Sequence, residues 1–287
     1  MKKIIFCALL AVFVFAQSFK AEPVAYKIFD KRGREVSWKD LVQQCKGMHV
    51  VFFGELHNNP ISHWLQLKLT QSLFVENKNL VLGAEMFEAD QQILMNEYLS
   101  GKITEKNFEA EMRLWTNYKT DYKPLVNFAV ENKLKFVATN IPRRYASVVS
   151  KKGKDELANF SDDAKKYMCP LPLTVDTSLK GYSDIMKMDM GHGTAINMVY
   201  AQAVKDATMA HFINKNLISG GLFLHYNGAY HSDNFQGIMH YLQKYNVSVA
   251  CGTITTVMQK DASKLEKENF GKADFTIVVD EEMTGTH

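Results

Sequence analysis

Short apolar runs alternate with longer amphipathic stretches along most of the chain. Apolar runs with the length and β-rich make-up of strands occupy 26–30, 49–53, 79–85, 135–140, 221–226, 247–252 and 274–279. Helical patterns occupy 37–43, 60–76, 88–130 and 195–213. Strands that alternate with helices are typical of a mainly parallel sheet covered by helices, so the pattern predicts an α/β protein.

Polar residues gather where the second predicted strand ends. Gly54 breaks that apolar run, and Glu55 and His57 follow with one residue between them. Two asparagines and a proline come next, which predicts that helix 60–76 begins there. The alternative is a plain helix cap with a solvated turn. However, an acid and an imidazole beside a buried strand are costly unless they are paired or used.

Three further predicted strands also end in polar residues. The strand at 79–85 ends in Glu85, the one at 135–140 is followed by Arg143, and the one at 221–226 is followed by His231. If these strands are parallel neighbours, their ends share one edge of the sheet, the edge where open α/β sheets bind ligands. Two carboxylates, two imidazoles and a guanidinium would then meet in one cleft. Arg143 or Arg144 could bind a carboxylate, either that of a ligand or that of Glu55 or Glu85, through its fork of donors.

The N-terminal residues have the pattern of a secretory signal. Lys2 and Lys3 precede an apolar stretch at 4–15 that is too short to span a bilayer, and Ala16 offers a cleavage site. We therefore expect a signal peptide at 1–16 and an exported, periplasmic or cell-surface protein. Cys7 stands too near the start of the chain, after a bulky residue, for a lipid anchor to be expected.

Composition narrows the classes of protein to which the chain can belong. The chain has 287 residues, 46% of them hydrophobic and 23% charged, which is an ordinary globular balance. Loss of Lys2 and Lys3 would lower the formal net charge from +3 to +1, which gives no electrostatic case for nucleic-acid binding. Cys45, Cys169 and Cys251 are odd in number and widely spaced, so they predict no disulfide framework.

The stretch at 150–198 differs in character from the rest. It is rich in lysine and carries methionines at 186, 188 and 190 shortly before His192. We interpret it as a mobile helical lid, whose methionines could flank a flat ligand or simply pack the lid onto the core. The last residues, acidic and then small, are expected to fray.

The strand-end motifs carry a resemblance to a known superfamily. The paired Gly-x-x-His motifs at Gly54 and Gly228 resemble the signature of the Tiki/TraB/erythromycin-esterase superfamily. The motifs that begin at Gly54, Glu85, Asn140 and Ala201 are similar to those of its ChaN-like, haem-binding uptake branch, and the resemblance runs over about 45–255. It implies a three-layer α/β/α fold with a helical lid, in one domain over 17–287 with insertions at about 88–130 and 150–198.

The resemblance also implies an exported protein that takes part in haem or iron uptake. Such a protein would hold its ligand between the lid and the carboxyl edge of the sheet, and an outer-membrane haem transporter would be a partner. Family haem binding is ascribed to an axial tyrosine; Tyr145, Tyr167, Tyr182 and Tyr230 are all candidates, and we choose Tyr182 and His192 in the lid. A flat ligand could also be sandwiched in a homodimer.

Two alternatives to haem binding remain open. Relatives in the wider superfamily are metal-dependent proteases or esterases. If this chain is one of them, His57, His231 and either Glu55 or Glu85 would hold a divalent ion. The remaining carboxylate would act as general base, and Arg143 would stabilise the developing oxyanion. In the other alternative, the strand-end polar groups form a structural network without turnover.

Overall fold

The computed structural model describes residues 24–187 and 194–287. A seven-stranded sheet has the order β1-β7-β6-β2-β5-β3-β4 and is parallel except at β1, which pairs antiparallel with β7. The strands are β1 (Tyr26–Asp30), β2 (Val50–Glu55), β3 (Leu80–Glu88), β4 (Lys135–Asn140), β5 (Leu222–Gly228), β6 (Cys251–Gln259) and β7 (Phe275–Asp280). The predicted α/β class with a mainly parallel sheet is confirmed.

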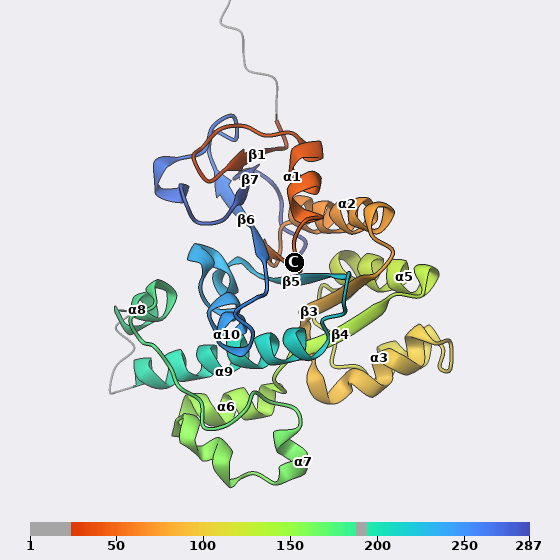
Figure 1. Cartoon of the computed structure of the whole chain (residues 1–287), viewed down its shortest axis with the longest axis vertical. Helices are drawn as coiled ribbons and strands as arrows, with labels where there is room; N and C mark the ends of the chain where they lie inside the picture. Colours follow the sequence, from red (N-terminus) through yellow and green to blue (C-terminus); the bar gives the residue numbers. More distant parts are fainter. Residues whose placement is uncertain (1–23, 188–193) are drawn as a thin grey trace, which may run out of the picture.

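Helices cover both faces of the sheet, which confirms the three-layer architecture (Figure 1). One layer contains α1 (Trp38–Cys45), α2 (Pro60–Glu76), α3 (Gln92–Leu99), α4 (Glu105–Glu111) and α5 (Lys123–Asn132). The other contains α6 (Arg143–Lys152), α7 (Asp162–Lys165), α8 (Lys180–Lys187), α9 (Thr194–Lys215) and α10 (Ile238–Tyr245).

The central strands are apolar on both faces because each face has its own core. In β2, Val51 and Phe53 pack into the core on the α2 side, whereas Val50 and Phe52 pack into the core on the α9 side. Successive side chains of a strand point to opposite faces, so a strand buried on both sides is read as a continuous apolar run. This pattern made β2 easy to predict.

The helix after β2 begins where the sequence predicts. The Asn59 side chain accepts a hydrogen bond of 2.9 Å from the backbone N–H of Ser62, and Pro60 occupies the first turn. The cap fixes the turn that connects β2 to α2, and it thereby positions the Glu55–His57 segment at the carboxyl edge of the sheet.

Two predicted elements are placed differently. The strand expected at 247–252 is β6, which begins only at Cys251, and Val247 is 90% exposed. The threonines of β6 made this strand hard to predict, because threonine is a polar residue in a sequence pattern. In the structure their hydroxyls can be buried with a hydrogen-bond partner: the Thr256 hydroxyl donates to the Gly54 carbonyl at 3.0 Å. The helical pattern at 88–130 comprises the end of β3, short helices and the π-helix η2 (Tyr118–Tyr122) before α5.

The described part of the segment 150–198 packs against α9. After α6 it forms a 3₁₀-helix, η3 (Lys154–Asn159), then α7, an irregular stretch and α8. Leu157, Met168 and Leu173 are buried in the core on the α9 side, so much of this segment contributes to the core. Met188, Met190 and His192 lie outside the described residues.

The expectation that the last residues fray is wrong. The backbone N–H of Thr286 donates to the Asn58 carbonyl at 2.9 Å, and its hydroxyl donates to Asp121 at 2.7 Å. The C-terminus therefore lies near the middle of the molecule, at the carboxyl edge of the sheet (Figure 1). Within the described ranges, every helix is too short or too polar to cross a membrane.

Candidate functional site

The strand order brings the four predicted polar strand ends together. β2, β5, β3 and β4 are consecutive parallel strands, so their carboxyl ends share one edge. A cavity of about 1140 Å³ opens at that edge, with walls from α6, α9 and the segment 114–117. Its lining includes Glu55, His57, Glu85, Asn140, Arg143, Tyr230 and His231.

Glu55 and His57 form the first ion pair of the site. His57 Nδ1 lies 2.9 Å from Glu55 Oε1, and the same oxygen accepts a hydrogen bond of 2.6 Å from the Tyr122 hydroxyl. Burial alone would lower the pKa of His57, but the bond to Glu55 and the charge of Glu85 outweigh it and raise that pKa. The two carboxylates therefore favour the protonated form of His57.

A second layer of polar side chains holds Glu55 in place. Gln66 of α2 donates to Glu55 Oε2 at 2.5 Å, and His63 Nδ1 lies 3.6 Å from the same oxygen. His63 Nε2 in turn lies 3.3 Å from Asp121. His63 is buried, although its place in the sequence favoured a plain surface histidine over one that faces the pocket. Gln66 and Asp121 were missed, because nothing in the spacing connects a helix face with a π-helix far along the chain.

His231 lies between two buried carboxylates. Its Nε2 is 3.1 Å from Glu85 of β3, and its Nδ1 is 2.5 Å from Asp206 of α9. Burial opposes a charged imidazole, yet the two carboxylates raise the pKa of His231 to about 10. Although burial raises the pKa of a carboxyl, His231, His57 and the Gly228 N–H hold that of Glu85 below its usual range.

Asp206 connects His231 with Tyr182 through hydrogen bonds, which explains the position of Tyr182. Burial raises the pKa of Asp206, although His231 and Tyr182 bond to it. Tyr182 is only 2% exposed, and its hydroxyl donates to Asp206 at 2.6 Å. The hydroxyl chosen as a haem ligand is thus engaged inside the core, outside the cavity lining. Asp206 itself was visible in the sequence only as part of a family-like motif on a helix.

The two Gly-x-x-His motifs interlock through their glycines. A Cβ on Gly54 would lie 2.9 Å from the Ala229 Cα, and one on Gly228 would lie 2.7 Å from the His57 Cε1. Both distances are shorter than real Cβ contacts allow. Each glycine therefore makes room for the other motif, and neither adopts the left-handed conformation that glycine alone tolerates well.

Arg143 and Arg144 pin carboxylates other than those considered from the sequence. Arg143 pairs with Glu88, which also pairs with Arg113 at 2.9 Å, and Arg144 pairs with Asp90 at 2.5 Å. Neither arginine binds Glu55 or Glu85 directly, because β3 runs on to Glu88 and presents this later acid to α6. The Arg143 side chain is 60% exposed and lines the cavity.

Two further haem-ligand candidates are His192, the second residue chosen, and Tyr230. His192 falls outside the described residues. Tyr230 lines the cavity and is 44% exposed, and its hydroxyl donates to the carbonyl of Gly181 in the first turn of α8. Burial raises the pKa of Tyr230 to about 12, with Asp184 and Asp206 adding to the effect, so its phenol keeps its proton at neutral pH.

The described donors do not match a metal site as they stand. Within 24–187 and 194–287, His, Cys, Asp and Glu side chains form no group of three that could hold a metal ion. His231 has a carboxylate on each ring nitrogen, which is the bonding of an imidazolium and leaves no lone pair for a metal. The residues predicted as metal ligands are therefore adjacent but bonded to one another.

The cavity does fit a flat, partly apolar ligand that carries negative charge. Apolar side chains line it at Leu114, Trp115, Ile141, Met198 and Met258, and the cations Arg143 and Lys205 stand beside them. The carbonyl oxygens of the Asn117 and Asn140 side chains are buried there without a hydrogen-bond partner. Apolar walls with a few polar groups and unused acceptors are typical of a ligand pocket.

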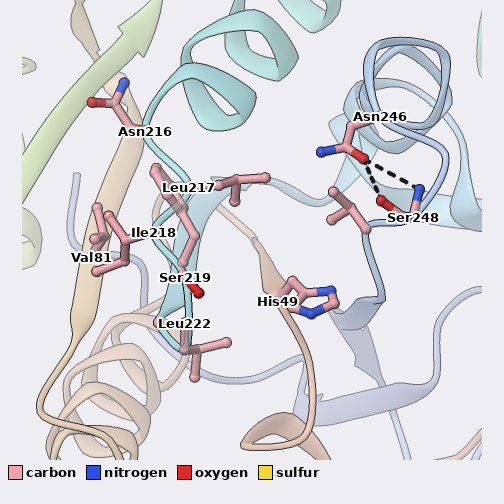
Figure 2. A pocket seen from close by; sticks show the side chains of 12 residues that line it. His49, Val81, Asn216, Leu217, Ile218, Ser219, Leu222, Asn246 and Ser248 are labelled. Carbon is pink, nitrogen blue, oxygen red and sulfur yellow. Dashed lines mark hydrogen bonds between the residues drawn. The ribbon is translucent and has the colours of Figure 1, made fainter.

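A smaller cavity of about 230 Å³ lies at the opposite edge of the sheet, near His49 (Figure 2). Four of its polar side chains are already bonded within the chain, those of His49, Asn216, Asn246 and Ser248. The backbone N–H of Ala250 donates to His49 Nδ1 at 2.9 Å, and Ser248 donates to the Asn246 side chain at 2.8 Å. This hollow therefore lacks the free polar groups of the larger cavity.

Two solved structures are similar to this chain in fold. The chain aligns with ChaN of Campylobacter jejuni, solved in a study of cofacial haem binding, over 88% of this chain and 96% of that one, with a TM-score of 0.67 and 16% identity, which shows a shared fold. The erythromycin esterase EreC aligns over 90% of this chain and 83% of its own, with a TM-score of 0.49 and 10% identity.

A curated relative and a family profile match the sequence itself. Protein RETICULATA-RELATED 5, chloroplastic, of Arabidopsis thaliana is 23% identical over 223 residues, which is 72% of this chain and 29% of that protein. The chain thus spans less than a third of that relative. The profile described as haem-binding uptake, Tiki superfamily, ChaN matches residues 41–242. This chain, with its interlocked Gly-x-x-His motifs at one sheet edge, belongs to the ChaN haem-binding uptake family of the Tiki superfamily.

Proposed function

We propose that this protein binds haem in the cavity at the carboxyl edge of the sheet and takes part in haem or iron uptake. The observation that carries the proposal is the cavity itself, which is about 1140 Å³ in volume and combines apolar walls with cations. Haem supplies an iron centre that binds one or two side-chain ligands. Membership of a haem-binding uptake family supports the same assignment.

The charged groups of the cavity match the ends of such a ligand. A porphyrin with propionate groups is apolar over most of its face and anionic at one side. Arg143 and Lys205 lie on the α6 and α9 walls, where they can meet carboxylates, while Trp115 and Met258 offer apolar surface. His57, whose pKa is raised by Glu55 and Glu85 against the effect of burial, can donate a further hydrogen bond.

The test is a haemin titration followed by the Soret absorption. Wild-type protein should give a saturable, shifted band, with a dissociation constant on the order of micromolar. Arg143→Gln should weaken binding roughly tenfold, because one charge-assisted bond to a carboxylate is lost. Arg144→Gln is the matched control, since Arg144 belongs to the same helix but lies outside the cavity lining. A wild-type spectrum identical to that of free haemin would overturn the proposal.

Export and partners extend this proposal. The N-terminal segment 1–16 is proposed to be a signal peptide, which would place the mature protein in the periplasm or at the cell surface, within reach of an outer-membrane haem transporter. The exposed side chains of Met198, Tyr230 and Met258 lie around the cavity, where a second copy of the chain could cover a flat ligand. Sedimentation with and without haemin would reveal such a homodimer.

A hydrolase is the second candidate, and one observation favours it. Two imidazoles with raised pKa values, each paired with carboxylates, stand in one cavity, and such perturbed groups cluster at catalytic sites. A metal-dependent version requires His231 to give up one carboxylate partner. Metal analysis and ester hydrolysis by wild type and His57→Ala would test it. Loss of bound metal or of turnover in the variant, with stability kept, would favour this candidate.

A further inference from the structure

The last residues of the chain form a strap across one end of the cavity. After β7, the Met283 N–H donates to the Asp280 carbonyl at 3.1 Å, and Met283 packs against the core on the α2 side. Gly285 then lies on Asn58, so close that a Cβ would be 3.2 Å from that side chain. Thr286 adds a backbone bond of 2.9 Å to the Asn58 carbonyl. Residues 283–287, here called the strap, are thus held at Met283, Gly285 and Thr286.

The anchor of the strap is a buried carboxylate. Asp121 is 3% exposed and accepts hydrogen bonds of 2.7 Å from both the Thr286 hydroxyl and the Asn117 side chain. The same oxygen lies 3.3 Å from His63 Nε2. A buried carboxylate needs such partners, because an unpaired charge in the core is costly. The strap therefore satisfies a group of the site rather than resting on the surface.

The docked strap places an imidazole in the cavity. His287 lines it together with His57, Asn58 and Trp115. His287 Nδ1 lies 3.5 Å from the Thr286 hydroxyl, which is too long to hold the ring firmly. His287 is therefore a cavity-lining side chain whose ring remains open to a ligand.

The other described groups that could bind iron in this cavity are engaged or poorly suited. His231 has a carboxylate on each nitrogen. His57 Nδ1 is bonded to Glu55, and its Nε2 lies against Gly228, where a Cβ would approach it to 2.8 Å. The Tyr230 hydroxyl donates a hydrogen bond to the Gly181 carbonyl. Thioethers, as in Met198 and Met258, are soft ligands and suit ferric iron less well than imidazole does.

We propose that the strap closes this end of the cavity and that the His287 imidazole binds the iron of the ligand. The inference rests on the proposed haem-binding function and names a residue for it. The anchor at Asp121 ties strap docking to the pocket, since Asp121, His63, Glu55 and His57 form one continuous chain of polar contacts.

The experiment compares haemin complexes of the full chain by absorption and electron paramagnetic resonance. Wild type should show an imidazole-type spectrum that His287→Ala abolishes, with affinity reduced roughly tenfold or more. Free imidazole added to the His287→Ala complex should restore the spectrum. Thr284→Ala, a neighbour whose side chain is exposed, is the matched control and should match wild type.

A second variant tests the anchor separately. Thr286→Val removes the hydroxyl that bonds to Asp121 and keeps the shape of the side chain. This variant should bind haemin several-fold more weakly than wild type, although His287 is still present. Added free imidazole should then compete with His287 for the haem iron.

The outcomes separate this inference from the proposed function. If wild type fails to bind haemin, both are overturned. If wild type binds haemin and His287→Ala has the same spectrum and affinity as Thr284→Ala, only the strap proposal falls. The strap proposal would also be overturned if Met258→Leu changed the haemin spectrum and His287→Ala did not.

Discussion

The buried imidazolium of His231 should make the stability of this protein fall in mild alkali. The pKa of His231 rises from an ordinary 6.5 to about 10 on folding, because Glu85 and Asp206 outweigh the effect of burial. A raised folded-state pKa contributes stability that is complete below pH 6.5 and is lost as the pH rises toward 10. Each pH unit within that window removes about 1.4 kcal/mol, since the unfolded chain releases a proton that the folded chain keeps.

The expected change can be isolated in a narrow pH range. Between pH 6.5 and 8, the contribution of His231 to the free energy of unfolding should fall by about 1.5 kcal/mol. The buried thiols of Cys45 and Cys169 also have raised pKa values because of burial, but they begin to matter only near their ordinary value of 9.0. His57 acts in the same direction as His231, so the comparison must be made between variants.

Urea unfolding of wild type and His231→Asn at pH 6.5 and 8 gives the measurement. The variant should be less stable by about 3–5 kcal/mol at pH 6.5, because two buried carboxylates lose their cation. It should also lose less stability on going to pH 8. His211→Asn is the control: burial and Lys215 lower the pKa of His211, so its titration acts below this range. Parallel pH profiles for wild type and His231→Asn would refute the reasoning.

Two further predictions concern groups around the cavity. Tyr182→Phe should cost about 1–3 kcal/mol of stability in urea, because a buried carboxylate loses a donor, yet leave the haemin spectrum unchanged; a shifted Soret band would return Tyr182 to the list of iron ligands. Gly228→Ala should displace the His57 ring, which a Cβ would approach to 2.7 Å, and weaken haemin binding. Gly47→Ala, where the nearest atom is 3.6 Å away, should bind haemin as wild type does.

The sheet was predictable because its strands are buried on both faces. Apolar runs with polar residues at their ends predicted β2, β3, β4 and β5, and the clustering of Glu55, Glu85 and His231 followed from parallel geometry alone. The strand order was not available from the sequence. That β5 lies between β2 and β3 depends on how helices from distant parts of the chain pack, which local patterns do not encode.

Partners across the site were harder to predict than the site itself. Asp206 and Glu88 lie on elements whose orientation is known only after the layers are assembled, so the bonds to His231 and Arg143 could not be foreseen. Tyr182 was chosen by residue type, although its hydroxyl points to a buried acid. Reactivity depends on such neighbours, whereas the pattern of apolar positions reports burial alone.

The position of β2 has a consequence for synthesis of the chain. Its two neighbours, β5 and β6, are encoded near the C-terminus, and the Gly54 carbonyl receives its bond from Thr256, 202 residues later. While the chain is growing, β2 therefore has two open edges and an apolar surface, the features that favour wrong pairing with other chains. We expect folding to be slow and to wait for the last strands, so the nascent protein stays for longer in a form that chaperones can hold.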